Sequence, residues 1–288
     1  MGCVSCVGLV KELESDQNDI SLRLKEPTTI PIEAECICPD LFVDRNYQEI
    51  LDFPLYYGRR KRRLGDLFTV EGEKSDLIHI DGDVKNVKRI GSSMTRGKIV
   101  VHGSVGMHVG ASMKGGMIFV EGDAGDKAGI SMQGGRLWIK GNAGHQTGAG
   151  RPGENHGVNR GVIVVEGNAG AELGACMRRG LIVVLGNAGD FVGAKMVAGT
   201  VMVFGHIGRR AGAGMKRGSV VSLGTIEPLL PTYHFESIVQ PVDMGIFSKY
   251  LKNLGVLFDP SIAEGLFQRY SGDINAFGKG EILIRVEH

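Results

Sequence analysis

One short phrase recurs between Gly97 and Gly224, and this repeat limits the folds open to the chain more than any other feature. Each copy is an aliphatic run closed by a glycine, and the closing glycines are Gly103, Gly122, Gly141, Gly167, Gly186, Gly205 and Gly224. Successive closing glycines are 19 residues apart, except for one step of 26 between Gly141 and Gly167. Periods of about 20 to 50 residues are typical of stacked arrays, in which each unit buries its apolar face only against its neighbours.

The aliphatic run of each copy has the alternation of a β-strand. Its second and fourth positions are always aliphatic, for example Ile99 with Val101 and Ile182 with Val184. These side chains should point inward, because residues two apart lie on one face of a strand. A helical repeat would not tolerate four glycines per unit, since each costs roughly 1 kcal/mol in a helix interior. We therefore predict an all-β solenoid made of about seven to eight 19-residue coils.

The outward positions of the same strands are also unusual for a soluble surface. The middle residue of each run is apolar, and this column reads Val100, Phe119, Trp138, Val164, Val183, Met202 and Val221. An apolar stripe of this length usually marks a contact, so we predict that the C-terminal helices or partner subunits cover it. The next outward column begins His102, Glu121, Lys140 and Glu166. Alternating ion pairs are the favoured interpretation of this row, and a catalytic ladder is the alternative.

Composition and charge exclude several classes of protein. The formal net charge of +1 argues against bulk nucleic-acid binding, which normally needs a strongly basic domain. No apolar run is long enough to span a membrane, and no apolar segment of a signal peptide is evident, so a cytoplasmic location is expected. We divide the chain into an N-terminal flanking or capping region (1–70), the glycine-repeat body (71–225) and a C-terminal part with a linker, helices and a final strand (226–288).

Two features before the repeat are open to functional interpretations. Cys3 with Cys6 and Cys36 with Cys38 are four thiols that could hold zinc or an iron–sulfur cluster, although the second spacing is unusual and free thiols are the simpler interpretation. The five consecutive cations 59–63 are either a solvated turn or a patch for a polyanion.

The long step in the repeat contains an insertion, GAGRPGENHGVNRG, between Gly148 and Gly161. Loops that interrupt a repeat project from one face and often carry binding. Its Arg151, Glu154, Asn155, His156 and Arg160 are candidates for polar contacts, and a decorative loop is the alternative.

Three segments together give a family resemblance. The glycine coils, the LGDLF segment at 64–68 and the ending FQRYSGDINAFGKGEILI resemble the C subunit of formylmethanofuran dehydrogenase, the tungsten or molybdenum enzyme that fixes CO2 as a formyl group in methanogenesis. The glycine repeat alone is also similar to the C-terminal domain of the glutamate synthase large subunit and to the C subunit of the bacterial formyltransferase/hydrolase complex. The flanking segments favour the dehydrogenase.

The resemblance implies a right-handed parallel β-helix without catalytic residues of its own. A tungsten or molybdenum pterin, iron–sulfur clusters and a dinuclear metal site would belong to formate dehydrogenase-like and amidohydrolase-like partner subunits, which this chain would join as a scaffold. Arg151 and Arg160 would then hold the polyanionic tail of a methanofuran-type carrier or meet a partner. The alternatives are a structural subunit of a formyltransferase/hydrolase complex and a free-standing carbohydrate-active β-helix.

Overall fold

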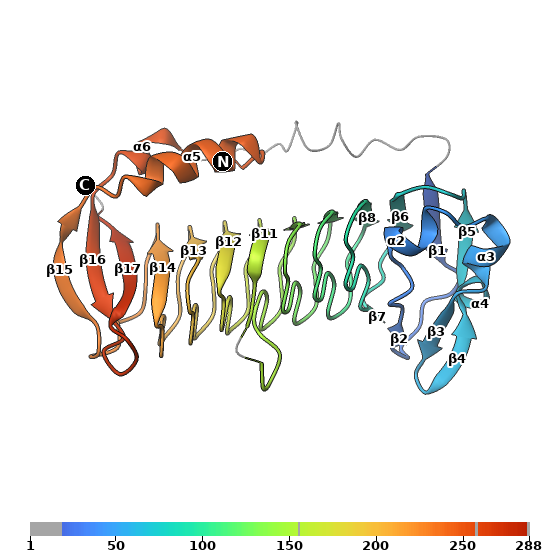
Figure 1. Ribbon diagram of the computed structural model, residues 1–288, viewed down its shortest axis with the longest axis horizontal. Coiled ribbons are helices and arrows are strands. Elements are labelled where there is room, and N and C mark those ends of the chain that lie inside the picture. The colour runs from blue at the N-terminus through green and yellow to red at the C-terminus, as the bar shows by residue number, and fades with distance from the viewer. Residues whose placement is uncertain (1–18, 155, 257–258, 287–288) are drawn as a thin grey trace.

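The computed structural model describes residues 19–154, 156–256 and 259–286. The described chain forms a long row of strands, with two helices along one side at the C-terminal end and a small hairpin-rich unit at the other end (Figure 1). Thirteen strands make one sheet in the order β15-β16-β17-β14-β13-β12-β11-β10-β9-β8-β6-β1-β5, and four more form a second sheet in the order β4-β3-β2-β7. The repeats lie in the middle of the larger sheet.

The strands of the repeats follow one another directly in that sheet. They are β6 (Leu77–Asp81), β8 (Lys98–His102), β9 (Met117–Val120), β10 (Arg136–Ile139), β11 (Asn159–Val165), β12 (Arg179–Val184), β13 (Thr200–Val203) and β14 (Arg217–Ser222). Each pairs in parallel with the next, and equivalent residues are partners, as in Trp138 with Phe119 and Val183 with Met202. The 19-residue spacing of the sequence therefore sets the register of the sheet, because it brings equivalent residues of successive repeats side by side.

Other elements close the two ends. The N-terminal ones are β1 (Ile20–Leu24), β2 (Ile32–Glu33), α2 (Pro39–Phe42), α3 (Tyr47–Leu51), β3 (Pro54–Tyr57), β4 (Arg60–Arg63), α4 (Leu64–Leu67), β5 (Phe68–Glu71) and β7 (Val87–Lys88). The C-terminal ones are β15 (His234–Val239), α5 (Asp243–Asn253), α6 (Pro260–Ala263), β16 (Phe267–Gly272) and β17 (Lys279–Arg285). The segment 260–270 gives one helical turn, α6, and then the start of strand β16. No helix among the described residues is long and apolar enough to cross a membrane.

The prediction of a right-handed parallel β-helix of about seven to eight coils was wrong. The structure has a 13-stranded mixed sheet. At one end β17 still pairs in parallel with β14, but β16 pairs antiparallel with β17 and β15 antiparallel with β16; at the other end β5 pairs antiparallel with β1. Each repeat contributes one strand to this sheet. Outside that strand, successive repeats are joined by isolated bridges, such as Val105 to Ala124. The physical reason is the turn density, because left-handed residues such as His108, Gly110 and Ser112 bend the rest of each repeat too tightly for a second extended strand.

The inward side chains form one continuous core. The second and fourth strand positions are fully buried, as predicted, with Ile99, Val101, Ile182 and Val184 at 0% exposure. A column of methionines fills the turn side of the same core, and Met94, Met113, Met132, Met177, Met196 and Met215 are also fully buried. Methionine suits this place because its flexible side chain fills irregular gaps between stacked turns.

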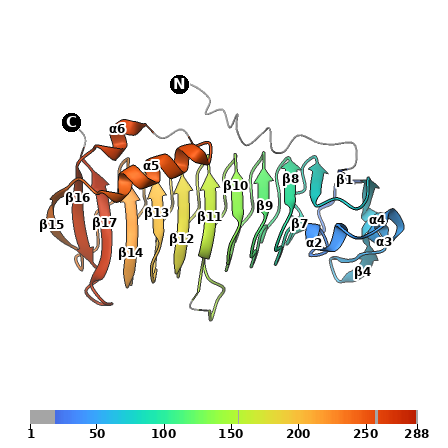
Figure 2. The same cartoon turned by 45° about the horizontal axis from the view of Figure 1, so that its top comes forward.

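The outward apolar stripe is buried as well. Phe119 and Trp138 are 2% exposed, and Val183 and Met202 are fully buried. Their cluster includes Met244, Leu251 and Leu254 of the C-terminal helical segment, and α5 lies over the later repeat strands in both views (Figures 1 and 2). The prediction that this stripe is covered is confirmed, and the C-terminal helices take part in the cover.

Candidate functional site

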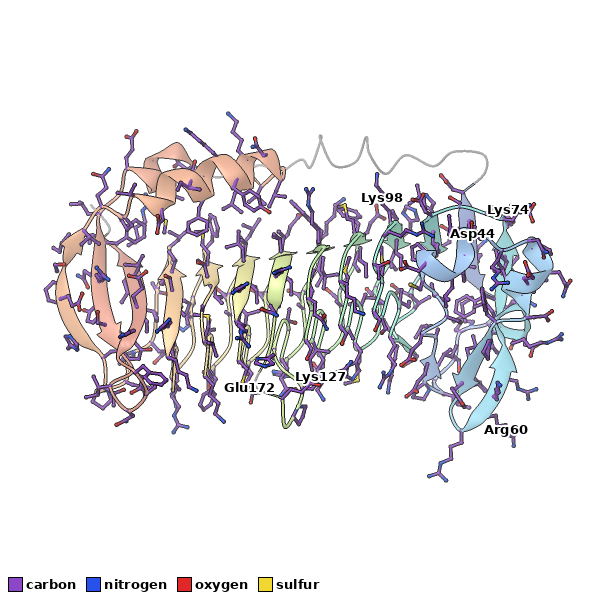
Figure 3. All side chains as sticks on the ribbon, viewed as in Figure 1. Asp44, Arg60, Lys74, Lys98, Lys127 and Glu172 are labelled. Atoms are coloured by element: carbon purple, nitrogen blue, oxygen red, sulfur yellow. The ribbon has the colours of Figure 1, made fainter. Side chains whose placement is uncertain are left out.

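The insertion between Gly148 and Gly161 projects from the turns of the repeats, the part of each repeat outside its strand. It contacts the repeats before and after it. Its backbone is tied to the next repeat, because Gly150 N donates to Ala175 O at 3.0 Å and Gly157 N donates to Cys176 O at 2.7 Å. The hydroxyl of Ser131 donates to Glu154 Oε2 at 2.8 Å. These contacts hold the insertion in a defined place, beside Lys127 and Glu172 on the turn side (Figure 3).

The two predicted arginines of the insertion differ in their surroundings. Arg151 Nη2 donates to Ser112 Oγ at 2.9 Å, and its Nη1 lies 4.0 Å from Glu154 Oε1. Arg151 lines two cavities, one on each side of the insertion. Arg160 is an exposed residue at the start of β11 and lines neither of them. Of the two arginines, Arg151 is therefore the one that lines these cavities.

The cationic run 59–63 forms the tip and the second strand of the β3–β4 hairpin. The four residues of β4 are all exposed, and Arg60 projects away from the body (Figure 3). Arg63 is engaged by two carboxylates, Asp52 at 3.2 Å and Asp66 at 3.3 Å. Lys61, directly opposite Tyr56 in the hairpin, lines the same cavity as Arg151. Two surfaces that the sequence predicts separately thus meet at one cavity.

The polar row on the strand face is held by mixed contacts. His102 Nδ1 lies 3.3 Å from Glu121 Oε2, which is one of the expected ion pairs when the imidazole is protonated. Lys140 Nζ lies 5.2 Å from the centre of the Phe119 ring, and Trp138 Nε1 donates to Glu166 Oε1 at 2.7 Å. The row therefore combines an ion pair, a cation–π contact and a hydrogen bond along the apolar stripe.

Sequence reasoning missed His79, which takes the place of the apolar column in the first repeat strand and contacts His102 of the polar row. Its ring stacks on that of His102 with centroids 5.2 Å apart, and Nδ1 lies 3.0 Å from His102 Nε2. Its Nε2 is buried and lies 4.0 Å from Asp19 Oδ2, beyond hydrogen-bond distance. The available signal was the break in the apolar column, because His79 pairs with Val100 where the other repeats carry apolar residues.

His79 should make stability depend on pH. Burial and then the neighbouring His102 hold the pKa of His79 below its usual range. The stabilising contribution of the neutral ring is therefore fully present above the unfolded pKa of about 6.5 and is lost as pH falls through the lower folded pKa. We expect His79→Gln to flatten the fall of the unfolding free energy below about pH 6.5, measured by urea denaturation. His234→Gln, at an exposed strand position, is the control, and equal slopes in the two variants would assign the dependence to other groups.

The cysteine candidates divide between described and undescribed residues. Cys3 and Cys6 lie outside the described part of the chain. Cys36 and Cys38 are buried, and desolvation raises the pKa of each to about 12. Without a metal ion, both thiols therefore stay protonated at neutral pH. Among the described residues, no group of three or more His, Cys, Asp or Glu side chains is placed to hold a metal ion.

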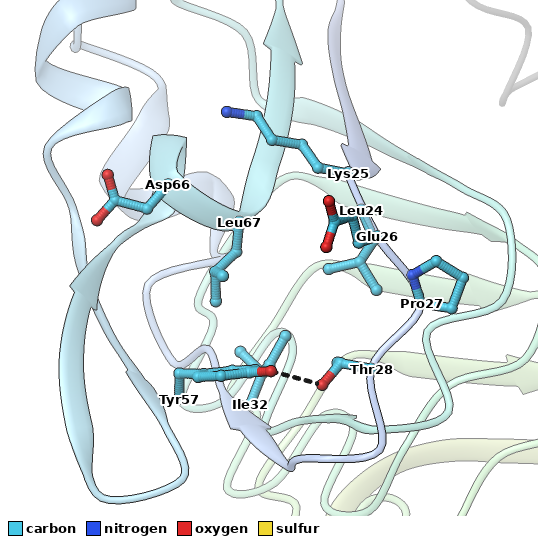
Figure 4. A pocket seen from close by; sticks show the side chains of 9 residues that line it. All are labelled: Leu24, Lys25, Glu26, Pro27, Thr28, Ile32, Tyr57, Asp66 and Leu67. Carbon is cyan, nitrogen blue, oxygen red and sulfur yellow. Dashed lines mark hydrogen bonds between the residues drawn. The ribbon is translucent and has the colours of Figure 1, made fainter.

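A smaller cavity of about 220 Å³ lies between the end of β1 and the β3–β4 hairpin (Figure 4). Tyr57 Oη and Thr28 Oγ1 hydrogen-bond across it at 3.0 Å. Lys25 at its rim donates to Gly65 O at 2.5 Å. Tyr57, Thr28 and Lys25 already have hydrogen-bond partners, and the cavity is smaller than the one beside Arg151 and Lys61, so it makes a weaker site.

Comparison with known proteins gives a consistent set of relatives. No protein-family model matches the chain. The C subunit of a tungsten-containing formylmethanofuran dehydrogenase from Methanothermobacter marburgensis is 44% identical over 97 residues, which are 32% of this chain and 36% of the relative. The C subunit of a molybdenum-containing formylmethanofuran dehydrogenase from the same organism is 44% identical over 87 residues, 30% of this chain and 22% of the relative. The aligned stretches thus span about a third or less of these curated relatives.

One solved structure matches over nearly the whole chain. It is a chain of the formyltransferase/hydrolase complex from Methylorubrum extorquens, determined in complex with methylofuran. The two chains are 33% identical with a TM-score of 0.87, and the match covers 93% of this chain and 100% of the other. The likeness therefore extends beyond the repeats to the flanking elements.

Proposed function

Because the chain belongs to the family that includes the C subunit of formylmethanofuran dehydrogenase and a chain of the formyltransferase/hydrolase complex, we propose that it is a scaffold subunit of a formylmethanofuran dehydrogenase complex. Such a complex converts CO2 and methanofuran to formylmethanofuran. The chain would join a formate dehydrogenase-like subunit to an amidohydrolase-like one. Tungsten or molybdenum pterin, iron–sulfur clusters and a dinuclear metal site would reside in those partners, and the assembly would work in the cytoplasm.

The observation that carries this proposal is the full-length match to a chain of a multi-subunit complex, at 33% identity and a TM-score of 0.87. The curated relatives then favour the dehydrogenase, because they include the C subunits of both its tungsten and its molybdenum form. We assign the repeat region 71–225 to the rigid spacer and the regions 1–70 and 226–288 to its capped ends.

The scaffold role fits the uses of the chain's own polar side chains. Trp138 and Glu166 bond to each other, Asp66 caps α4 by accepting from Arg63 N, and Asp40 accepts from Thr95 N at 2.7 Å. These hydrogen bonds stabilise turns, a helix start and the side chains packed on the sheet. We infer that catalysis belongs to the partner subunits and that this subunit fixes their separation.

A second function is favoured by the same structural match, which is to the formyltransferase/hydrolase complex. In that case the chain would be the structural subunit of a transferase and hydrolase pair, without a redox partner. Metal and pterin analysis of the native assembly separates the two. Stoichiometric molybdenum or tungsten with a pterin supports the dehydrogenase, and an assembly without either supports the second function.

The proposed carrier contact can be tested through the insertion. A methanofuran-type carrier with a polyanionic tail would bind Arg151 and Arg160 by charge-assisted hydrogen bonds, each worth about 1.5 to 3 kcal/mol when desolvated and less at exposed sites. Arg151→Gln with Arg160→Gln should raise the KM for the carrier several-fold at low salt, with a smaller effect at high salt because screening weakens the native contact. Assembly should be unchanged.

The matched control for this double variant is Arg209→Gln with Arg217→Gln, which removes the same charge from two exposed arginines of later repeats. If the Arg151 and Arg160 variant falls out of the complex, the insertion is an interface with a partner subunit. If neither assembly nor KM changes, the insertion makes no contribution to carrier use.

A further inference from the structure

A cavity of about 600 Å³ opens between the N-terminal elements and the first repeat. Its apolar lining comes from Leu41, Phe53 and Leu55, and the Phe53 ring stacks on that of Phe42, with centroids 5.4 Å apart. Leu55 is buried, whereas Leu41 is 44% exposed and so presents carbon surface to the opening. The volume lies within the roughly 300 to 1,000 Å³ of small-molecule sites, and the lining combines this apolar surface with charged and hydroxyl side chains, the carboxylates of Glu33 and Glu35 among them.

Three cations from three separate segments converge on this cavity. They are Lys61 of β4, Arg89 in the turn after β7 and Arg151 of the insertion. Arg89 is held in the left-handed region, with φ of 67°, and its Nη1 lies 2.6 Å from Glu35 Oε1. Among the residues that the structure describes, no carboxylate lies within ion-pair distance of Lys61. Lys61 is thus available for an outside anion.

The lining also contains a buried hydroxyl oxygen that makes no hydrogen bond. Ser92 Oγ is buried and has no hydrogen-bond partner among the described residues. Such orphaned groups are uncommon in folded proteins, because each forfeits the hydrogen bonds that it makes in water. A ligand oxygen or amide in the cavity would satisfy it. Nearby, burial and then repulsion from Arg89, Lys127, Lys88 and Arg151 lower the pKa of His108, which places the turn side here in a positive field.

We propose that this cavity binds a small amphipathic anion, an aromatic or acyl molecule that carries a carboxylate. Its apolar body lies against Leu41, Phe53 and Leu55, and its carboxylate meets Lys61 and Arg151. The proposal goes beyond the scaffold role, since a spacer subunit needs no ligand. It also differs from the carrier contact of the insertion, because Lys61 takes part and Arg160 does not.

The test uses two probes of the same ring and different charge on the purified full-length chain. The probes are 1-naphthoate and the neutral 1-naphthylmethanol, with binding measured by isothermal titration calorimetry at low salt. We expect naphthoate to bind at least about tenfold more tightly, because its charge-assisted hydrogen bonds contribute on the order of 1.5 kcal/mol or more. Lys61→Gln should weaken naphthoate binding by about fivefold and leave naphthylmethanol unchanged.

Arg62→Gln is the matched control, because Arg62 is the next residue on the same strand, carries the same charge and does not line the cavity. Equal affinities for the two probes, equal effects of the two variants, or no binding of naphthoate would each overturn the proposal. The native complex provides a further arm. If the free chain binds naphthoate and the complex does not, a partner segment occupies the cavity and the small-ligand proposal fails, whereas the scaffold proposal stands.

Discussion

Gly134→Ala is expected to lower the free energy of unfolding by about 3 kcal/mol or more, because overpacking a filled site typically costs 1 to 3 kcal/mol and a rigid neighbour raises that cost. A Cβ at Gly134 would lie 2.2 Å from the backbone oxygen of Lys114 in the preceding repeat. Backbone atoms cannot swing aside as a flexible side chain does. The same approach recurs one repeat earlier, where a Cβ at Gly115 would lie 2.1 Å from Thr95 O. The substitution therefore tests whether close backbone stacking determines the repeat.

The control for this variant is Gly245→Ala. Gly245 lies in α5, and a Cβ there would meet nothing within 4 Å. Alanine is favoured over glycine in a helix interior by about 1 kcal/mol, so this change should leave stability equal or slightly higher. Chemical denaturation of both variants is the measurement. A Gly134→Ala protein as stable as the Gly245→Ala protein would contradict the close stacking of the repeats.

The second large effect is expected for Leu251→Asp. Leu251 is fully buried in the cluster that joins α5 to the outward stripe. An aspartate there loses the packing of the leucine and buries a carboxylate without a partner, which together cost at least about 3 kcal/mol. The helix should leave the sheet rather than bury the charge. The rate of amide hydrogen exchange in α5 should then rise strongly. The fluorescence of Trp138 reports whether the outward apolar stripe becomes exposed to water.

Ile246→Asp is the control in the same helix, because Ile246 is 65% exposed. It should change stability by less than about 0.5 kcal/mol, as surface substitutions usually do. If the two variants show the same exchange in α5, this helix is not held by its contact with the stripe.

The repeat could be predicted from the sequence because glycine and aliphatic positions recur in step with the sheet. The inward positions follow from that alternation, and the burial of Phe119 and Trp138 follows from the length of the outward apolar stripe. The short helix α3 was also predictable, since Asn46 and Glu49 form a capping box at its start. What failed was the architecture beyond one strand per repeat. A glycine pattern predicts where turns lie. It does not reveal that the turns of each repeat are too tight for a second strand, nor that antiparallel strands form the ends of the sheet.

The sequence predicts the individual residues of the candidate site but not that they lie together. Arg151 and Lys61 are each part of a conspicuous polar segment, but 90 residues separate them, and no local pattern indicates that they line one cavity. Their meeting depends on how the β3–β4 hairpin packs beside the first repeat. His79 was hidden for a related reason, since it interrupts an apolar column in the least regular repeat. Long-range placement of this kind needs the three-dimensional structure.

The central claim is that this chain works as a subunit of a larger complex, and its native mass tests that claim most directly. The chain alone has a mass of 30.9 kDa. Purified through a tag from its own source and measured by size-exclusion chromatography with light scattering, it should run in an assembly several times heavier. Formate dehydrogenase-like and amidohydrolase-like subunits should be present in fixed ratio. A single species at the mass of the chain alone, without partners, would contradict the scaffold account.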